Sequence, residues 1–333
     1  MKEFKAGKNE AGQRLDKYLK KILPNASMGF IYKMLRKKNI KLNDKKASGT
    51  EIVSVDDKIK IFLSDDTFAK FSVNEDSLMK DFKALGALKP DGLGVVYEDD
   101  DILAANKPVN MLSQKSKETD ISANERLIGY LIKEGKLDFD TYKSFKPSVC
   151  NRLDRNTSGI VLCGKSLPGS QALSRVIKDR TIRKFYRTVC VGEMKEDAVL
   201  NGYLQKDERT NRVTVVEEIP EGDNGDYAPI HTAYHPLTTN GEYTLLEVEL
   251  ITGKTHQIRS HLASVGHPII GDAKYGNPKV NQFFRKGNGL QNQLLHAYRL
   301  EFPKETGVLN PLSGQNVTAP CPKLFKRITE QLF

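Results

Sequence analysis

Residues 151–166 read NRLDRNTSGIVLCGKS, and the second half of this stretch decides the fold class. From Gly159 to Ser166 it fits G-x-x-x-x-G-K-[ST], the pattern of the phosphate-binding loop in nucleotide hydrolases. Such a loop must curl so that its backbone N–H groups face phosphates, whereas Ile160, Val161 and Leu162 form an apolar run that is mostly β-branched. The stretch therefore predicts a buried strand of a sheet and argues against a nucleotide hydrolase.

The first half of the same stretch places one carboxylate between two permanent cations. Asp154 follows Arg152 by two residues and precedes Arg155 by one. An acid beside arginines on a turn is commonly a solvated ion pair worth about 0 to 1 kcal/mol. Taken alone, the stretch leaves open whether Asp154 is a surface acid or a reactive one.

The remainder of the chain beyond residue 94 is rich in predicted strands. Alternating or continuous apolar runs predict strands at 95–98, 102–107, 160–164, 185–192, 212–218, 230–237 and 243–251. Helical spacing is expected at 170–179 and at 256–266, where Ile258, Leu262 and Val265 take the core face and Gly266 ends the helix. We therefore predict an α+β domain built on a large sheet.

Positive charge is concentrated at the start of the chain. The 333 residues carry a net charge of +10, and residues 1–63 hold 16 Lys and Arg against 7 Asp and Glu. A chain of this length suits about two domains. The charge predicts a polyanionic partner, most plausibly nucleic acid, although a basic solvated face is the alternative.

Residues 1–63 predict a small helix-helix-strand unit. Helices are expected at 14–23 and 28–39, the second capped by Ser27, and strands at 40–43 and 57–63. This order, with RLDKYL at its head, resembles the alpha-L RNA-binding domain shared with small-subunit ribosomal protein S-four. The resemblance implies RNA contacts through Arg14, Lys17, Lys33, Arg36, Lys37, Lys38 and Lys41. Residues 64–93 lose the periodicity and predict a linker, so that a catalytic domain spans 94–333.

A metal site and a membrane segment are not expected. Cys150, Cys163, Cys190 and Cys321 form no C-x-x-C pair, which indicates reduced, mostly buried thiols. A metal hydrolase is a possible interpretation of His256, His261 and Asp272, but helical positions five apart differ by about 140° and do not share a face. No apolar run approaches about 18 residues, and the start of the chain lacks the apolar segment of a secretory signal. We therefore expect a cytoplasmic protein.

Five sequence blocks together resemble the RluA-type pseudouridine synthases. NRLDRNTSG resembles their H-R-L-D-x-x-T-S-G motif, and KFYRTVCVG at 184–192 resembles K-x-Y-x-A-x-V-x-G. Three further segments are similar to segments of the family: VVYEDDDILAANKP at 95–108, TGKTHQIRSHLASVGHPIIGDAKYG at 252–276 and LLHAYRLEF at 294–302. All five blocks follow the order that they have in the family. The chain departs from the family pattern at Asn151, Lys254, Thr188 and Asn110, where His, Arg, Ala and Gly are usual.

This resemblance implies both a fold and a chemistry. The fold is a large mixed, mainly antiparallel sheet with flanking helices behind the RNA-binding domain, and the reaction converts uridine to pseudouridine without a cofactor or a metal. By the resemblance Asp154 is the essential carboxylate, Arg259 pairs with it and orients it, and Tyr186 stacks on the uracil or accepts a proton. The residues implied to bind substrate are Arg152, Lys184, Thr157, His256, Gln257 and Lys107.

Some questions stay open at this level. Asp154 could attack the sugar, attack the base or remove a ribose proton. We expect a monomer that acts on large-subunit ribosomal RNA or a pre-ribosomal particle, flipping the target nucleotide out of the folded RNA. A tRNA-directed synthase is the nearer alternative, and a non-catalytic ribosome-associated RNA-binding protein is the more distant one.

Overall fold

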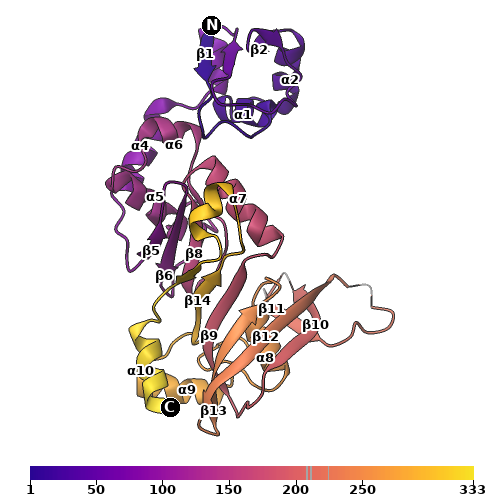
Figure 1. The fold of residues 1–333 in the computed structure, drawn as a ribbon, viewed down its shortest axis with the longest axis vertical. Helices are drawn as coiled ribbons and strands as arrows, with labels where there is room; N and C mark the ends of the chain where they lie inside the picture. Colours follow the sequence, from indigo (N-terminus) through magenta and orange to yellow (C-terminus); the bar gives the residue numbers. More distant parts are fainter. Residues whose placement is uncertain (208, 211, 224) are drawn as a thin grey trace.

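The computed structural model describes residues 1–207, 209–210, 212–223 and 225–333. Two sheets organise this part of the chain, and Figure 1 shows the smaller one at the top, at the N-terminus. The four-stranded sheet has the order β1-β4-β2-β3, and the eleven-stranded sheet has the order β11-β10-β12-β13-β9-β14-β8-β6-β5, with β15 beside β14 and β7 beside β8. The predicted α+β class is confirmed.

The N-terminal unit, defined here as residues 1–71, is built around one apolar core. Helices α1 (Leu15–Ile22) and α2 (Met28–Arg36) pack on strands β1 (Lys2–Lys5), β2 (Ile40–Leu42), β3 (Lys45–Lys46) and β4 (Lys58–Ile61). The Ser27 hydroxyl caps α2 by accepting from the Phe30 amide at 3.1 Å. Ile59 and Ile61 are fully buried while Lys58 and Lys60 alternate with them, as the sequence predicted.

Residues 64–93, predicted as a linker from their loss of periodicity, contain two helices. Helix α3 (Asp65–Phe71) begins after the cap Ser64, and helix α4 (Glu75–Gly86) begins after the cap Asn74. The Phe71 ring lies 4.4 Å from the Phe30 ring of the N-terminal unit, whereas α4 packs on helix α5 (Ala123–Lys133) beside the larger sheet. Both helices are short and mainly polar, and each is stabilised by packing on a different core, which local periodicity does not reveal.

Among the described residues, the larger sheet is antiparallel except for one pair of strands. Its strands are β5 (Gly94–Glu98), β6 (Ile102–Lys107), β7 (Ser148–Val149), β8 (Ser158–Gly164), β9 (Arg183–Val191), β10 (Ala198–Asp207), β11 (Arg212–Val216), β12 (Tyr227–Thr239), β13 (Tyr243–Leu250), β14 (Leu295–Glu301) and β15 (Asn316–Thr318). Strands β14 and β8 run parallel. Every residue of β8 is buried, which confirms the strand prediction for this stretch and excludes a phosphate-binding loop there.

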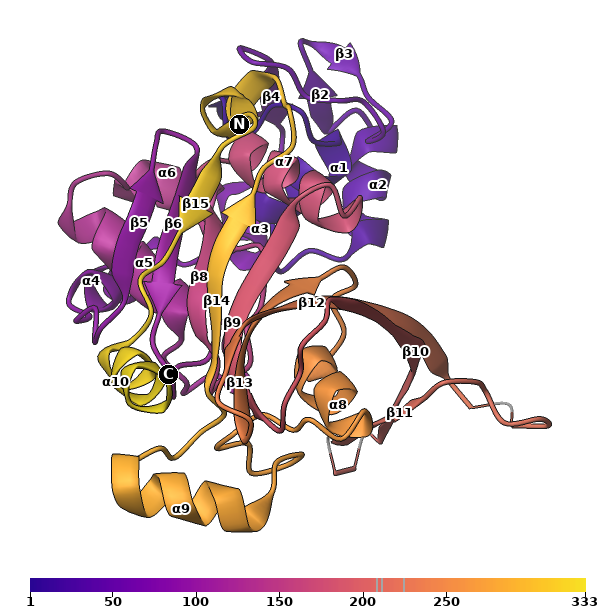
Figure 2. The ribbon, with the colours of Figure 1, turned by 60° about the horizontal axis from the view of Figure 1, so that its bottom comes forward.

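Helices cover both faces of this sheet. Helices α5 (Ala123–Lys133) and α6 (Phe139–Ser144) pack with α4 on the face that carries Tyr186. Helix α7 (Leu167–Lys178) and the 3-10 helix η1 (Gly307–Leu312) pack on the opposite face, against Ile160 and Leu162. Figure 2 shows strands β10 to β13 curling around helix α8 (Gln257–Ser264), while α9 (Pro278–Asn288) and α10 (Lys323–Leu332) flank the end of the sheet. This curl brings α8 close to the turn before β8.

One side chain of α8 departs from the predicted core face. Ile258 and Leu262 are buried, but Val265 is 38% exposed. The helix ends at Ser264, so Val265 is already its C-cap, with φ −95° and ψ 13°. Among the helices that the structure describes, none combines the length and apolar character needed to cross a membrane.

Contacts link the N-terminal unit to the start of α7. The Lys8 ammonium lies 2.9 Å from the Asp101 carboxylate, and the Leu167 amide donates to the Asn9 side-chain oxygen at 3.0 Å. The Gln171 side chain donates to the Gly12 carbonyl at 3.4 Å. The basic unit is thereby attached to the face of the sheet opposite Tyr186.

Candidate active site

The turn that carries Asp154 is fastened at both of its ends. The Asn151 side-chain oxygen accepts from the Leu162 amide at 2.7 Å, and its amide nitrogen donates to the Ile160 carbonyl at 3.1 Å. The Thr157 amide donates to the Asp154 carbonyl at 3.1 Å and closes the turn. Asn151, one of the departures from the family pattern, therefore holds the turn against β8. The Asp154 side chain projects from this turn and is 28% exposed.

Arg259 reaches Asp154 from the first turn of α8. Its Nη1 donates to Asp154 Oδ2 at 2.8 Å, and its own side chain is 7% exposed. The expected pairing of these two residues is thus present. Burial alone would lower the pKa of Arg259, but hydrogen bonds and charge from Asp272, and then from Asp154, raise the pKa instead. The guanidinium therefore stays charged.

A second carboxylate holds the other side of the same guanidinium. Asp272 Oδ2 accepts from Arg259 Nε at 2.6 Å, and Asp272 Oδ1 accepts from Nη2 at 2.9 Å. The Asp272 side chain is 1% exposed and also accepts from the amides of Lys274 and Tyr275. Burial would raise the pKa of Asp272, but Arg259 outweighs it and lowers the pKa. One cation thus lies between two anions.

His256 lies on the other side of Asp154. It precedes α8 with φ 54°, and its Nε2 is 4.0 Å from Asp154 Oδ2. Its Nδ1 forms a 2.9 Å hydrogen bond with the Tyr275 hydroxyl. Burial lowers the pKa of His256 below its usual 6.5, although the Asp154 charge opposes this shift. The imidazole is therefore mainly neutral at pH 7.

Tyr186 on β9 forms the apolar wall of the site. It is buried in the same core cluster as Ile258 and Leu295. Burial, with a smaller contribution from the Asp154 charge, raises the pKa of Tyr186. The phenol consequently stays protonated near neutral pH.

The side chains of Asp154, Tyr186, His256 and Arg259 line one small pocket of about 60 Å³. The lining residues come from the turn before β8, from β9, from the segment leading into α8 and its first turn, and from the ends of β13 and β14. They are Arg152, Leu153, Asp154, Thr157, Tyr186, Leu250, Lys254, His256, Gln257, Ile258, Arg259 and Leu295. Seven residues expected from the sequence therefore meet here: Asp154, Tyr186, Arg259, Arg152, Thr157, His256 and Gln257.

Two of the expected substrate-binding residues, Lys107 and Lys184, do not line this pocket. A third, Gln257, lines it, but its side-chain amide is already hydrogen-bonded within the protein. Lys107 is 0% exposed, and Lys184 lies on β9 outside the lining. Burial, together with Arg180, lowers the pKa of Lys184. The Gln257 amide bonds to Thr252, the Lys254 amide, the His231 carbonyl and Thr232. This geometry fits a role in shaping the pocket wall, not in binding the base directly.

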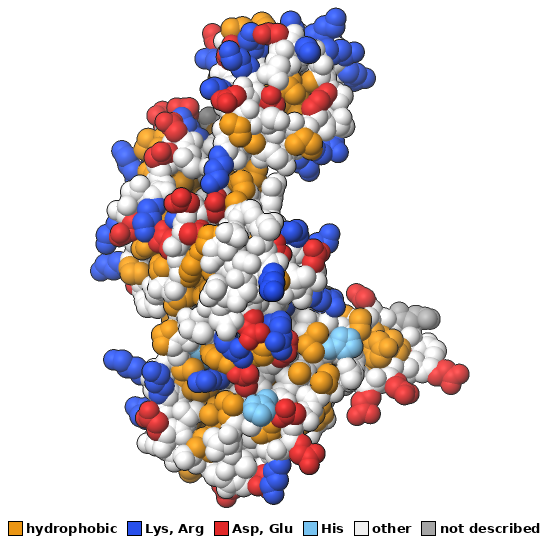
Figure 3. Space-filling model, in the orientation of Figure 1, with side chains coloured by type: hydrophobic (Ala, Val, Ile, Leu, Met, Phe, Trp, Pro, Cys, Tyr) orange, Lys and Arg blue, Asp and Glu red, His pale blue; other side chains and the backbone are white. Residues whose placement is uncertain are grey.

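The side chains expected to bind RNA lie on the N-terminal unit. Lys17, Lys33, Arg36, Lys37 and Lys38 are exposed, and Figure 3 shows Lys and Arg gathered at this end of the molecule. Arg14 differs, because it pairs with Asp16 at 2.7 Å. Lys41 lies 5.4 Å from the Phe62 ring centre.

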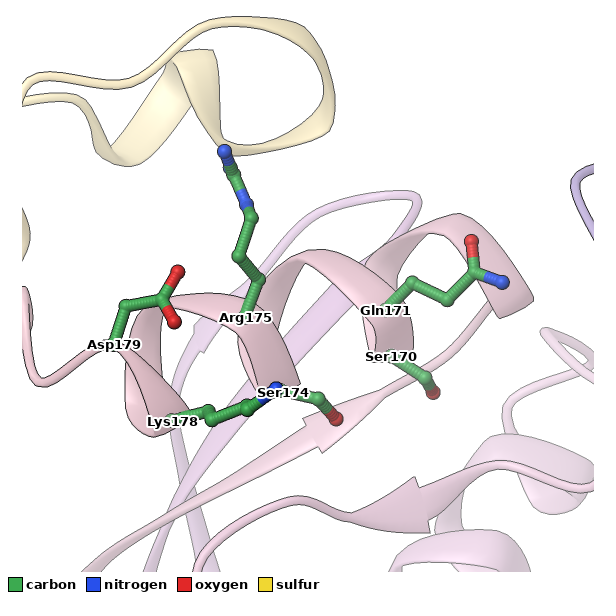
Figure 4. A pocket seen from close by; sticks show the side chains of 6 residues that line it. All are labelled: Ser170, Gln171, Ser174, Arg175, Lys178 and Asp179. Carbon is green, nitrogen blue, oxygen red and sulfur yellow. The ribbon is translucent and has the colours of Figure 1, made fainter.

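A larger hollow of about 440 Å³ follows α7 on the opposite face of the sheet. Figure 4 shows its lining side chains, which are Ser170, Gln171, Ser174, Arg175, Lys178 and Asp179. Arg175 points away toward the segment around η1 and pairs there with Glu305. The hollow lacks the pairing of a carboxylate with a buried arginine that distinguishes the smaller pocket.

Metal-ligand geometry is not found in the described ranges, where no three His, Cys, Asp or Glu side chains are grouped to hold an ion. His256 bonds to Tyr275, and His261 bonds to the Thr232 hydroxyl at 3.0 Å.

Two residues of the site, Asp272 and Tyr275, were not expected there from the sequence. Asp272 was considered only as a metal ligand, and Tyr275 was not singled out. Both lie in the segment GDAKYG, so the signal was the spacing of an acid and a tyrosine shortly after the helix that carries Arg259.

Comparisons with known proteins point to one family. Residues 101–264 match the family described as RNA pseudouridylate synthase. An uncharacterized RNA pseudouridine synthase of Mycoplasma genitalium is 30% identical over 305 residues, covering 91% of this chain and 89% of that protein. The ribosomal large subunit pseudouridine synthase C of Rickettsia bellii is 30% identical over 324 residues, covering 95% and 96%. The solved structure of human RNA pseudouridylate synthase domain containing 4 has a TM-score of 0.58 at 20% identity, covering 76% and 97%, and shows a shared fold.

Proposed function

The chain belongs to the RNA pseudouridylate synthase family, and from that premise we propose that it converts uridines of large-subunit ribosomal RNA to pseudouridine with Asp154 as the essential catalytic residue. The single observation that carries the role of Asp154 is its placement: a partly exposed carboxylate bonded to a buried arginine in a pocket walled by a tyrosine.

The ion pair supports a reactive carboxylate. Arg259 and Asp272 form a fixed, charged anchor, and Asp154 Oδ2 is bonded to it. Among the described residues, none donates a hydrogen bond to Asp154 Oδ1. That oxygen is thus available to stabilise or attack an electron-poor carbon as the bond between uracil and ribose breaks.

The pocket supports a flipped-out nucleotide. Extruding a base from folded RNA costs a few kcal/mol, which contacts elsewhere must supply. Tyr186 offers an aromatic wall for the uracil, and exposed Arg152 lies at the pocket edge, where it can take the place of the extruded base. The pocket volume of about 60 Å³ implies that Arg152 or Lys254 moves when the base enters.

The N-terminal unit supports binding to a large RNA. Six of its seven candidate residues are exposed cations, and lysine and arginine contacts to phosphates provide affinity with little sequence information. We propose that this unit is an S-four-like RNA-binding domain that fixes the register of the substrate. Relatives named ribosomal large subunit pseudouridine synthase C favour the RNA of that subunit as the substrate.

Mapping of pseudouridine in cellular RNA tests the substrate. Cells without the gene are compared with cells that express either the wild-type chain or Asp154→Asn. We expect specific pseudouridines in large-subunit ribosomal RNA to disappear without the gene and to return with the wild-type chain alone. Loss of tRNA pseudouridines, with ribosomal RNA unchanged, would refute the proposed substrate.

A further inference from the structure

We propose that Asp272 and Tyr275 are positioning residues for the isomerisation. Each holds one of the two side chains that flank Asp154: Asp272 holds Arg259, and Tyr275 holds His256. Neither residue lines the pocket, so neither acts on the substrate itself. This inference rests on the proposed role of Asp154 and adds the residues that set the geometry around it.

Asp272 determines which edge of the Arg259 guanidinium faces the substrate. A guanidinium has five N–H donors in a rigid plane, and Asp272 engages Nε and Nη2 together. Nη1 is then directed to Asp154, where it makes one bond of 2.8 Å to Oδ2. The arrangement limits Arg259 to a single contact with Asp154.

Removal of the Asp272 charge would change this contact. A buried arginine without its first carboxylate would pair with the remaining one, and arginine prefers to bind carboxylates through two parallel hydrogen bonds. Both oxygens of Asp154 would then be engaged, and the oxygen that faces the substrate would become a weaker nucleophile. Asp272 thus keeps Asp154 reactive, because it accepts hydrogen bonds from two of the three guanidinium nitrogens of Arg259.

Tyr275 performs a similar task for His256. The Tyr275 hydroxyl accepts from the Val213 amide of β11 at 3.0 Å, so its own proton can be donated to His256 Nδ1 at 2.9 Å. A neutral imidazole that accepts at Nδ1 carries its proton on Nε2. Nε2 is the nitrogen that faces Asp154, at 4.0 Å. Tyr275 thereby directs an N–H group toward the reacting carboxylate.

The segment between these two residues is rigidly attached. The Asn281 side chain of α9 donates to the Asp272 carbonyl at 2.8 Å and accepts from the Gly271 amide at 2.7 Å. A Cβ on Gly271 would lie 2.3 Å from the Asn292 carbonyl oxygen, and one on Gly276 would lie 2.3 Å from the Asp272 carbonyl oxygen. Glycines at both positions allow the close approach that places Asp272 and Tyr275.

Steady-state kinetics of Asp272→Asn and Tyr275→Phe on an RNA stem-loop that the wild type modifies test the proposal. We expect kcat to fall by about 10- to 100-fold for Asp272→Asn, with KM and RNA affinity unchanged, because positioning groups act on the bound state. Removing one hydroxyl in Tyr275→Phe should lower kcat by about 3- to 10-fold and shift the acid limb of the kcat profile, since His256 loses its partner.

Glu249→Gln provides a matched control. Glu249 accepts from Arg183 Nε at 2.8 Å and Nη2 at 2.7 Å, the same two-bond geometry, but it lies outside the pocket. We expect its kcat and KM to equal those of the wild type. An equal loss of kcat in this control would overturn the proposal, because the effect would then follow from losing any such ion pair.

A double variant separates positioning from structural support. If Asp272 acts through Arg259, Asp272→Asn should cause little further loss of kcat in an Arg259→Lys background. Fully additive losses would contradict the proposal. Thermal unfolding checks that each variant is folded. If Asp272→Asn fails to fold, Asp272→Glu replaces it. Asp272→Glu keeps the charge but displaces the guanidinium, so it should also lower kcat without changing KM.

The outcomes distinguish this inference from the function on which it rests. Wild-type turnover by Asp154→Asn would refute the catalytic role of Asp154. An inactive Asp154→Asn together with wild-type kcat in both Asp272→Asn and Tyr275→Phe would refute the positioning roles alone.

Discussion

Nζ of Lys107 lies 3.3 Å from the carbonyl oxygen of Arg155, the residue that follows Asp154. Lys107 also donates to the carbonyls of Pro108 and Met111 at 3.0 and 2.8 Å. A fully buried lysine therefore joins the end of β6 to the turn that presents Asp154. Its role is to hold the backbone of the site.

Lys107→Met should impair this turn while preserving most of the packed volume. Each buried carbonyl that loses its donor costs about 1 to 3 kcal/mol, so we expect reduced stability and a fall in kcat larger than any change in KM. Urea unfolding and steady-state kinetics measure both. Wild-type kcat in a folded Lys107→Met protein would show that the turn does not depend on this lysine.

The same substitution should change how stability depends on pH. Burial lowers the pKa of Lys107 from 10.5 to about 7. Between pH 7 and 10.5 the unfolded chain keeps the Lys107 proton, whereas the folded chain has released it. The free energy of unfolding therefore rises as pH increases through this range, and the gain is lost as pH falls toward 7. Lys107→Met lacks this contribution. From pH 7.5 to 9, the difference in unfolding free energy between the wild type and the variant should shift in favour of the wild type by up to about 1.4 kcal/mol per pH unit. A constant difference in urea unfolding would contradict the burial of this amine.

Arg259→Lys should lower activity although it preserves charge. One ammonium cannot reproduce the two bonds to Asp272 and the one to Asp154, which use three nitrogens of the guanidinium. We expect kcat to fall by about 10- to 100-fold. Arg183→Lys is the control, because Arg183 makes a similar pair with Glu249 away from the pocket. Equal turnover in Arg259→Lys and the wild type would show that the planar geometry is unimportant.

Charge removal on α2 and its C-terminal end should weaken RNA binding in a salt-dependent way. Lys33, Arg36, Lys37 and Lys38 are exposed, and each lost phosphate contact should reduce the slope of log affinity against log salt by about 0.7 to 0.9. Filter binding between low and physiological salt measures this slope for the fourfold alanine variant. A control variant with alanine at three exposed lysines, Lys80 and Lys83 on α4 and Lys89 just after it, should retain the wild-type slope. Identical slopes for both variants would place the phosphate contacts elsewhere.

The sequence predicted elements where local pattern and burial agree. The run Ile160–Leu162 predicted β8 because a continuous apolar stretch suits a strand covered on both faces. Helix α5 was not predicted, although Ser122 and Glu125 form a capping box ahead of an amphipathic segment, so its signal was present and overlooked. Helices α3 and α4 carried weaker signals, because their stability comes from tertiary contacts.

The sequence predicted most residues that line the candidate site, but not the residues that support them. Asp154, Arg259, Tyr186 and His256 were expected together from the sequence resemblance, and the pocket brings them together. Lys107 was expected to bind substrate, whereas its ammonium is bonded to three backbone carbonyls. Sequence alone does not show which polar groups are occupied by protein partners, since this depends on segments far apart in the sequence, such as those of Lys107 and Arg155, meeting in space.

The most direct test is single-turnover isomerisation by Asp154→Asn, an almost isosteric change that keeps an oxygen available to Arg259 Nη1. The variant should bind the RNA substrate with wild-type affinity and form no pseudouridine, because it lacks the ionised oxygen proposed to react. Pseudouridine formation at the wild-type rate would contradict the proposal that this carboxylate performs the chemistry.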